Sequence, residues 1–483
     1  MNKKRILSAL ICFLLLLSLP AQANVYSRGE PLTYVYRQRY IVENRSSQAS
    51  TDIELTIPAM FPDPFSNQFI LDTHWSRQPA RLYRDERGNL TAIIIIPRLE
   101  PGARTEIIQE YRVRNFTISF DLTSPGASYS SPHPSYLQPE SKVESNHRDI
   151  IAKAREITAG KVTDVEKARA IFAFVQQYMT YGGSYRNMGA LSALTHRSGV
   201  CEDYAALFVA LCRASGIPAR MVYGEGSTQI IGGFYGHAWA EFFLPTHGWV
   251  PVEPTVTSKE VPWRYFAALP GDYRHIIFGL TGTSFSWKWR GGQITVSSNL
   301  TVTEDTSTRI FSDLDTHWAR TEIIDLAFRG IVTAEQGRFE PGKAMTRGEA
   351  ARLLVLAQGI TPIYGPSVFT DVKSEDLFHP YIQAAAKAGI FAGFEDGTFR
   401  PNDRITREQM AAVLSRIKGY NGGGQNTVLT FTDSHTIAPW ALSAVQYSVG
   451  AGLFGGDDQN RFRPKDTCSR AEAAVLIHRL LSK

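Results

Sequence analysis

The stretch Gly199-Val200-Cys201-Glu202-Asp203-Tyr204 and the apolar run that follows it decide how the middle of the chain folds. Apolar residues recur after Cys201 at the spacing of one helix face, and Gly216 is a natural end for that helix. Cys201 would then lie in the first turn of the helix, where the helix dipole stabilises a thiolate. Because the thiolate is the nucleophilic form, the pattern predicts a reactive cysteine rather than an inert core residue, which is the alternative.

A base and a carboxylate follow in two predicted strands. His237 lies in Tyr-Gly-His-Ala-Trp-Ala-Glu at 235–241, and Glu253 lies in Trp-Val-Pro-Val-Glu-Pro-Thr at 249–255. A Pro/Gly turn separates them, and Pro245 is the midpoint between the two residues. We therefore expect His237 and Glu253 to lie side by side across a hairpin. This is the arrangement of nucleophile, base and orienting acid used in covalent acyl transfer.

These motifs, with Arg-Ala-Ser-Gly-Ile-Pro-Ala-Arg at 213–220, resemble the transglutaminase-like superfamily of papain-like thiol enzymes over about residues 148–257. The resemblance implies Cys201 as nucleophile, His237 as general base and acid, and position 253 as the third catalytic residue. The family usually has aspartate at that third place. Glu253 keeps the charge but adds a methylene, so its hydrogen bond to His237 needs a different backbone position. The interpretation includes no cofactor and no metal ion.

The N-terminus predicts export. Lys3, Lys4 and Arg5 precede an apolar run, Ile6–Leu19, and small residues end at Ala23, so residues 1–23 are typical of a signal peptide. An uncleaved membrane anchor is the alternative, although the run is short for a span of about 20 residues. Cleavage would remove three positive charges and reduce the net charge from +5 to +2. We therefore expect no nucleic-acid partner and no stable membrane insertion. The three cysteines that remain do not form a disulfide framework.

The 483 residues are enough for about three domains, and the patterns favour a multidomain α+β protein. Period-two alternation predicts a β-sandwich-like domain at 24–122. Residues 123–147 are rich in Ser and Pro and are interpreted as a linker. Residues 148–305 are expected to form the catalytic domain, with helices from Asp149 and from Asp164 to Met179 packed against the Cys201 helix, and with one or two closing strands at its end.

From Phe311 onward the chain repeats itself, with units predicted at 308–360, 366–420 and 428–483. Each unit opens on Phe-Ser/Thr-Asp, and the steps between units are 58 and 62 residues. Each unit then has a Phe-x-Pro segment, followed by a Thr or Ser that is expected to cap an apolar helix starting with arginine.

These units resemble surface-layer homology repeats, three of which form an all-α trimer in that family. The resemblance implies grooves that bind pyruvylated secondary cell-wall polysaccharide. An arginine fixed at a helix start is a suitable bidentate donor for a ketal carboxylate. The expected binding residues are Arg347, Arg407 and Arg470, with Asp313, Asp371 and Asp433 orienting the grooves and Trp318 and Trp440 stacking on sugar or packing internally. For any one arginine, a structural ion pair is the alternative. The second unit departs from the pattern at Leu377 and Gln409, which suggests a weaker groove there.

The sequence thus favours a secreted enzyme anchored to the cell wall or S-layer, which attacks amide bonds of a protein or a peptidoglycan peptide through a thioester. Water as acceptor gives peptidase or amidase chemistry, which we favour, and a lysine amine gives a cross-link. The alternative is an inactive transglutaminase-like scaffold that only binds the wall.

Overall fold

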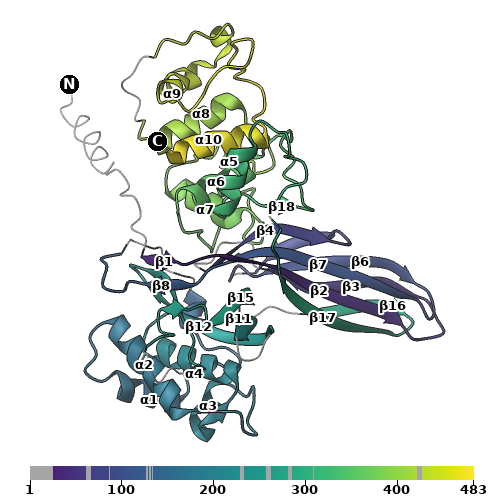
Figure 1. Cartoon of the computed structure of the whole chain (residues 1–483), viewed down its shortest axis with the longest axis vertical. Helices are drawn as coiled ribbons and strands as arrows, with labels where there is room; N and C mark the ends of the chain where they lie inside the picture. The colour runs from purple at the N-terminus through teal and green to yellow at the C-terminus, as the bar shows by residue number, and fades with distance from the viewer. Residues whose placement is uncertain are drawn as a thin grey trace, which may run out of the picture.

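The computed structural model describes residues 25–60, 67–85, 87–126, 129, 132, 134–228, 233–256, 263–280, 285–307, 309–420 and 427–482. The predicted signal peptide at 1–23 lies outside these ranges. Within them, no helix combines the length and the apolar character needed to cross a bilayer. The molecule has helices α1 to α4 at one end, long strands in the middle and helices α5 to α10 at the other end (Figure 1). The chain is a multidomain α+β protein.

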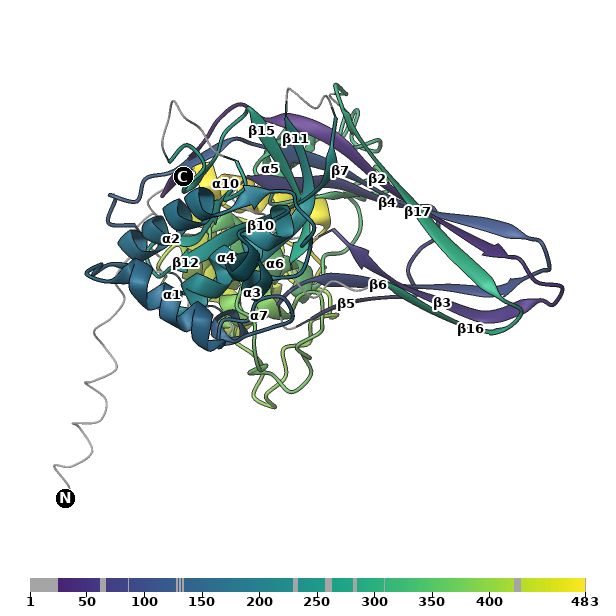
Figure 2. The ribbon, with the colours of Figure 1, turned by 90° about the horizontal axis from the view of Figure 1, so that it is seen from below.

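Two antiparallel sheets form the middle part. One has the order β17-β2-β7-β4 with the short β18 joined in parallel at its edge, and the other has the order β16-β3-β6-β5. Figure 2 shows the two sheets as two layers of strands. Buried residues of both sheets, such as Val42 and Ile107 from one and Ile53 and Ile94 from the other, form a shared core. The strands are β2 Leu32–Asn44, β3 Ser50–Ala59, β4 Gln68–Trp75, β5 Arg81–Arg84, β6 Leu90–Leu99, β7 Arg104–Asn115, β16 Ser286–Gly291, β17 Ile294–Glu304 and β18 Ala334–Glu335.

The last two long strands belong to these sheets and not to the part that carries Cys201. β17 pairs with β2 over its whole length, from Ile294 opposite Asn44 to Glu304 opposite Tyr34, and β16 pairs with β3. The expectation that residues 148–305 form one domain is therefore wrong for 286–304. Period-two alternation identifies a strand, but it does not say which sheet offers the free edge.

Helices and a four-stranded sheet surround Cys201. The helices are α1 Arg148–Thr158, α2 Asp164–Tyr178, α3 Ala190–His196 and α4 Cys201–Ala214. The sheet has the order β13-β12-β11-β15, with β11 Ala219–Thr228, β12 Tyr235–Leu244, β13 Gly248–Val252 and β15 Tyr273–Leu280. Thr163 and Glu166 form a capping box at the start of α2, and the predicted inward residues of that helix are buried. Shorter elements are β1 Tyr26–Arg28, β8 Ile118–Phe120, β9 Thr180–Tyr181, β10 Ser198–Gly199, β14 Ala268–Leu269 and the 3-10 turn η1 Pro134–Leu137.

Side-chain amides of the middle sheets hold β15. Gln68 donates to the carbonyl of Ile277 and accepts the N–H of the same residue, both at 2.7 Å. Asn67 and Asn115 donate to the carbonyl of His275 at 3.0 and 2.7 Å. All three amide side chains belong to buried residues. The outer strand of the sheet around Cys201 is therefore fixed by the sheets that precede it in the chain.

The repeats follow as α5 Arg320–Phe328, α6 Arg347–Ala357, α7 His379–Lys387, α8 Arg407–Ile417, the 3-10 turn η2 Ser434–Thr436, α9 Pro439–Gly450 and α10 Arg470–Ser482. The predicted caps are confirmed: Thr346 and Thr406 accept from Glu349 and Gln409, and Ser469 accepts from the N–H of Glu472. β18 lies in the first repeat, so the expectation of an all-α unit is not met there.

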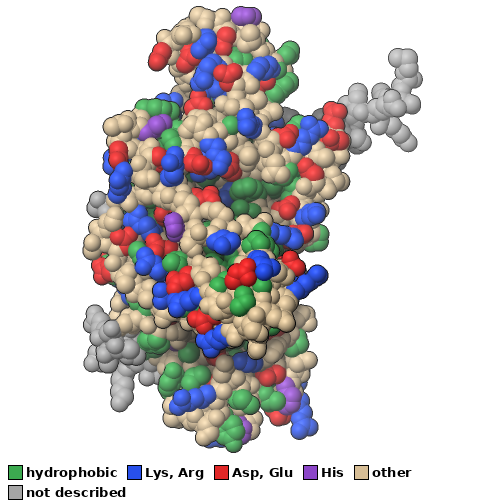
Figure 3. Space-filling model, turned by 90° about the vertical axis from the view of Figure 1, so that its right-hand side faces the viewer, with side chains coloured by type: hydrophobic (Ala, Val, Ile, Leu, Met, Phe, Trp, Pro, Cys, Tyr) green, Lys and Arg blue, Asp and Glu red, His purple; other side chains and the backbone are tan. Residues whose placement is uncertain are grey.

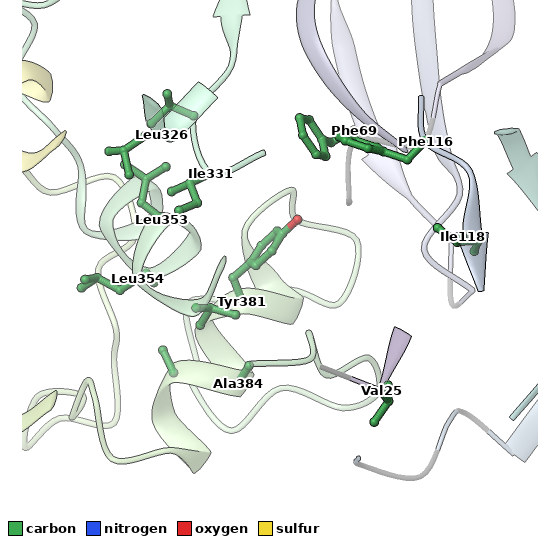
Figure 4. Packing of buried hydrophobic residues seen from close by; sticks show 14 of the residues in the cluster. Val25, Phe69, Phe116, Ile118, Leu326, Ile331, Leu353, Leu354, Tyr381 and Ala384 are labelled. Carbon is green, nitrogen blue, oxygen red and sulfur yellow. The ribbon is translucent and has the colours of Figure 1, made fainter. Parts of the chain in front are cut away.

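The first two repeats pack on the middle sheets. β18 pairs with β4, and Arg84 Nε donates to the carbonyl of Leu377. Figure 4 shows Leu326, Ile331 and Leu353 gathered within the repeats, with Phe69 and Phe116 on the facing strands. Gly330 has a positive φ of 74°, and a Cβ there would lie 2.8 Å from the Phe69 ring, so glycine permits this close approach. On the outside, basic and acidic side chains are interspersed (Figure 3).

Candidate active site

The start of α4 is held in place by Asp203. The helix begins at Cys201, as the sequence predicts, and the Cys201 side chain is only half-buried. Asp203 is 1% exposed, and its two oxygens accept four backbone N–H groups, from Asn187, Met188, Gly189 and Val200, at 2.7–3.0 Å. These bonds fasten the segment before α3 to the helix start and so fix the position of the thiol.

His237 and Glu253 lie in contact. His237 Nε2 donates to Oε2 of Glu253 at 2.6 Å, and both side chains are almost fully buried. Because Nε2 is used in this way, Nδ1 remains for Cys201. Cys201 is close enough to the ring to interact with it, because the Cys201 side chain is among the groups that raise the pKa of His237. The expectation that His237 and Glu253 are neighbours is confirmed.

The register that produces this contact differs from the one we expected. Leu244 pairs with Gly248 and Ala240 pairs with Val252, so the hairpin is centred on Thr246 and not on Pro245. The loop has three residues, and Gly248 follows it at a φ of 72°, the left-handed conformation common in such hairpins. Glu253 stands just beyond the last pair and reaches His237 diagonally on the same face of the sheet.

His275 on β15 is a member of the site that sequence reasoning missed. Its Nε2 lies 2.9 Å from Oε2 of Glu253, the oxygen that also accepts from His237. Its side chain is 0% exposed, and Nδ1 lies 3.0 Å from the carbonyl of Tyr273. We assign the Nε2–H tautomer, because a carboxylate is a stronger acceptor than a carbonyl. A single histidine in an alternating strand carries no local sign of this role.

The charges of the site follow from these contacts. Burial by itself lowers the pKa of His237, but the Glu253 carboxylate and the bonds to Glu253 and Cys201 outweigh it and raise the pKa to about 9. Burial raises the pKa of Glu253, yet His237 and His275 hold it well below its usual value. Burial lowers the pKa of His275. The site therefore holds a carboxylate between a protonated His237 and a neutral His275.

The same three residues are the one group of potential metal ligands among the described residues, with ligand atoms within 4.8 Å of one another. Their spacing fits hydrogen bonds better than a metal ion. Ligand atoms at about 2.0–2.1 Å from a tetrahedral zinc would stand more than about 3 Å apart. The nitrogens of His237 and His275 are 2.6 and 2.9 Å from one oxygen of Glu253.

Several tyrosines lie near Cys201. Tyr181 is 59% exposed, and its phenol and that of Tyr235 both interact electrostatically with Cys201. The hydroxyls of Tyr235 and Tyr273 are 2.8 Å apart, and burial raises the pKa of Tyr273 far above its usual value. These three phenols, whose pKa values are raised, are therefore uncharged at neutral pH and lie near Cys201.

The three predicted binding arginines all lie where one repeat meets the next. Arg347 and Arg407 are each 6% exposed, and their Nε groups donate to the carbonyls of Phe399 and Phe462. Arg407 also pairs with Glu472 at 2.8 Å, and Arg470 pairs with Glu349 at 3.1 Å. Two of the three arginines therefore have the structural ion pair that was the alternative.

The three predicted aspartates hold a backbone turn. Asp313 accepts from the N–H groups of Phe339 and Glu340, and Asp371 and Asp433 repeat this at the matching positions. The second residue of each turn has a positive φ of 56–60°. These bonds use one acceptor site on each oxygen and fix the turn, so we assign the aspartates an indirect part in shaping the grooves.

The two tryptophans are exposed, Trp318 at 65% and Trp440 at 60%. Leu377, which replaces the aromatic in the second repeat, instead packs against the core of the middle sheets. The departure at Leu377 therefore has a structural reason: that repeat faces the rest of the protein.

Comparisons with known proteins agree with this division of the chain. The model of the transglutaminase-like superfamily matches residues 151–254, and that of the S-layer homology domain matches 310–351, 368–411 and 430–474. A solved structure described as a candidate cysteine protease from Cytophaga hutchinsonii covers 58% of this chain and 94% of its own, with 17% identity and a TM-score of 0.40.

Curated relatives match over shorter parts. An amylopullulanase of Thermoanaerobacterium thermosulfurigenes is 35% identical over 42% of this chain and 11% of its own length. An S-layer protein of Bacillus thuringiensis subsp. finitimus is 34% identical over 33% of this chain and 20% of its own. The chain thus spans a fifth or less of these relatives. It carries a transglutaminase-like core followed by three S-layer homology repeats.

Proposed function

We propose that this protein is a secreted cysteine enzyme that acts on amide bonds and is tethered to cell-wall polysaccharide by its three repeats. The observation that carries the proposal is the buried contact between His237 and Glu253, 2.6 Å, beside the half-buried thiol at the start of α4. Glutamate in place of the usual aspartate is accommodated because three donors hold it: His237, His275 and the N–H of Thr255.

In the proposed reaction, Cys201 Sγ attacks the carbonyl carbon of an amide while its proton is held on His237. The C–N bond breaks as His237 donates this proton to the departing amine, which leaves a thioester. A water molecule then attacks the thioester while His237 takes its proton, and the acid and the free thiol are released. A lysine amine in place of water would give a cross-link. We favour hydrolysis, giving a peptidase or amidase, with a protein or peptidoglycan peptide as substrate.

The S-layer homology repeats and the S-layer protein among the relatives support attachment to the cell wall. The wall ligand we propose is pyruvylated secondary polysaccharide, which presents carboxylates to the arginine grooves. Deleting residues 308–483 is a poor test, because it would also strip β18 from β4 and uncover Phe69. Binding of the full chain to purified walls, with point variants in the grooves, avoids this problem.

Thiol labelling tests the enzyme against the inactive scaffold, but selectivity alone does not decide. Cys212 and Cys468 are each 0% exposed, and burial raises the pKa of both thiols, so Cys201 should react first in either case. The useful readout is the labelling rate of Cys201 at pH 6, compared between the natural protein and His237→Asn. We expect the rate to fall at least about tenfold in the variant. Equal rates would support the scaffold.

Incubation of the protein with peptidoglycan and with an amine-bearing reporter, followed by mass spectrometry, then identifies the acceptor. A mass gain of water in the substrate supports hydrolysis. A mass gain of the reporter supports transfer.

A further inference from the structure

The three arginine grooves are built by the same backbone contacts. Each arginine is the first residue of its helix, and its N–H donates to the following repeat: Arg347 to the carbonyl of Asp403, Arg407 to that of Asp466, and Arg470 to that of Lys343. The third repeat therefore closes onto the first. Equivalent positions in the three grooves can be compared directly.

In two grooves the capping glutamate of the next repeat also neutralises the arginine. Glu472 accepts the N–H of Ser469 through Oε2, and its Oε1 pairs with Arg407 at 2.8 Å. Glu349 likewise accepts the N–H of Thr346 through Oε2, and its Oε1 pairs with Arg470 at 3.1 Å. One carboxylate thus serves as a helix cap and as a counter-ion at the same time.

The equivalent residue facing Arg347 is Gln409. Its one oxygen accepts the N–H of Thr406 at 3.1 Å, so only the amide NH2, a donor, is left for the groove. Among the described residues, no carboxylate lies within 4.0 Å of the Arg347 guanidinium. Asp371 and Asp403 attract the Arg347 guanidinium only at longer range, and each oxygen of Asp371 accepts a backbone N–H, from Phe399 or Arg400.

A second position also differs between the Arg347 groove and the other two grooves in what its side chain contacts. The residue after the phenylalanine that the three repeats share is Arg400 beside Arg347, Arg463 beside Arg407 and Glu340 beside Arg470. Arg463 binds Glu472, and Glu340 interacts electrostatically with Arg470. Arg400 instead pairs with Asp396 at 2.8 Å at the groove edge. At these two positions the Arg347 groove has a cation and an amide, the Arg407 groove a cation and a carboxylate, and the Arg470 groove two carboxylates.

All three arginines lie over phenylalanine rings, and the Arg347 groove has an additional ring, Phe394, at a position where the other two grooves have none. The Arg347 guanidinium lies 4.7 Å from the centre of the half-buried Phe394 ring, and Arg400 lies 4.0 Å from it. The matching residue of the third repeat is Asp457. Aromatic faces stabilise a cation but accept no full hydrogen bond from it. A buried cation without a counter-ion is unfavourable, and an anionic ligand would remove that cost.

We propose that the groove between the first and second repeats, built on Arg347, is the site where this protein binds a carboxylate carried on a sugar ring, and that internal glutamates occupy the other two grooves. The carboxylate would take the place that Glu472 takes on Arg407, and the sugar ring would lie on Phe394. This deepens the wall-anchoring function proposed above and rests on it. It also reverses the expectation that Gln409 weakens a groove.

The test uses the full-length protein and calorimetric titration with three methyl glycosides: a 4,6-pyruvylated pyranose, a glucuronoside and a neutral glucoside. We expect one bound equivalent of an acidic glycoside and no binding of the glucoside. Tighter binding of the pyruvylated pyranose would identify a ketal carboxylate as the ligand, and tighter binding of the glucuronoside would identify a uronate. Gln409→Glu should weaken binding at least about tenfold, because it supplies the missing internal carboxylate. It should not lower the melting temperature, because glutamate forms the same cap in the other two repeats.

Glu472→Gln is the reciprocal variant and should add a second bound equivalent by freeing Arg407. Equal binding by Gln409→Glu and the natural protein, or three equal sites in the natural protein, would overturn the groove assignment. Binding of the same proteins to purified walls separates the two proposals. If the walls bind the natural protein and Gln409→Glu equally well, the anchoring function stands and the groove assignment fails. If they bind neither, both proposals fail.

Discussion

Oε2 of Glu253 accepts hydrogen bonds from two histidines, His237 at 2.6 Å and His275 at 2.9 Å. Its other oxygen accepts the N–H of Thr255 at 2.8 Å. A buried glutamate has one more rotatable bond than an aspartate, and three donors from three segments of chain remove that freedom. His275 therefore acts as a positioning residue, through Glu253, on the ring that faces Cys201.

Replacing His275 tests this role. His275→Leu removes the donor and should slow acylation of Cys201 by an amide reporter about 10- to 100-fold, because one to three kcal/mol of hydrogen bonding to a buried charge is lost. His275→Gln keeps a donor at a similar reach and should restore most of the rate. Melting temperatures of both variants provide the control. If both variants are equally slow and equally destabilised, His275 is structural only.

The carboxylate of Glu253 should set the protonation of His237. The pKa of His237 is raised to about 9 by Glu253 and Cys201 against the effect of burial. In Glu253→Gln the attraction is gone while burial remains, so the imidazolium should lose its proton at a pH at least about one unit lower. The alkaline fall of activity, where His237 can no longer protonate the departing amine, should move by the same amount.

An NMR titration of the His237 ring measures this shift without needing a substrate. Glu202→Gln is the matched control, because Glu202 is next to Cys201 but is not among the groups that shift His237. An unchanged His237 midpoint in Glu253→Gln would contradict the charge assignment of the site.

The sequence predicted the local parts of this site well. The start of α4 at Cys201 and the neighbouring positions of His237 and Glu253 follow from helix periodicity, turn residues and hairpin spacing. The expected hairpin centre was wrong by one residue, Pro245 instead of Thr246, because a two-strand pattern does not specify how many residues the turn encloses. His275 was missed because the spatial approach of β15 to Glu253 depends on packing between distant segments.

The same limit applies to the middle sheets and to the repeats. Alternation identified β16 and β17 as strands but assigned them to the wrong part of the chain, since the free edges of β3 and β2 lie more than 200 residues earlier. The repeats were found from their motifs alone. Which arginine has an internal counter-ion became visible only when the third repeat was seen to close onto the first.

Gln68 is expected to couple the middle sheets to the strand that carries His275. Gln68→Ala removes both hydrogen bonds to Ile277 and leaves a buried N–H and a buried carbonyl unpaired. We expect the free energy of unfolding to fall by about 2–4 kcal/mol in a urea titration. Gln48→Ala, at an exposed side chain, is the control and should change it by less than about 0.5 kcal/mol. A drop of similar size in both variants would show that the amide contributes nothing specific.

Asp203 should be as important for the position of Cys201 as any residue that touches the thiol. Each of its oxygens accepts two backbone N–H groups, Oδ1 from Met188 and Gly189, and Oδ2 from Asn187 and Val200. Asp203→Asn puts an NH2 group against two of these donors, so a buried repulsion replaces two charge-assisted bonds. We expect the free energy of unfolding to fall by about 2–4 kcal/mol.

The neighbouring Glu202→Gln makes the same chemical change on a half-buried side chain and serves as the control for Asp203→Asn. Hydrogen exchange of the backbone at 187–189 gives a second, local readout. In Asp203→Asn these amides should exchange faster even at temperatures where the protein stays folded, and labelling of Cys201 should slow with them, because the helix start is no longer tied to this segment. If exchange at 187–189 is unchanged, the segment is held by its other contacts, and Asp203 does not position the thiol.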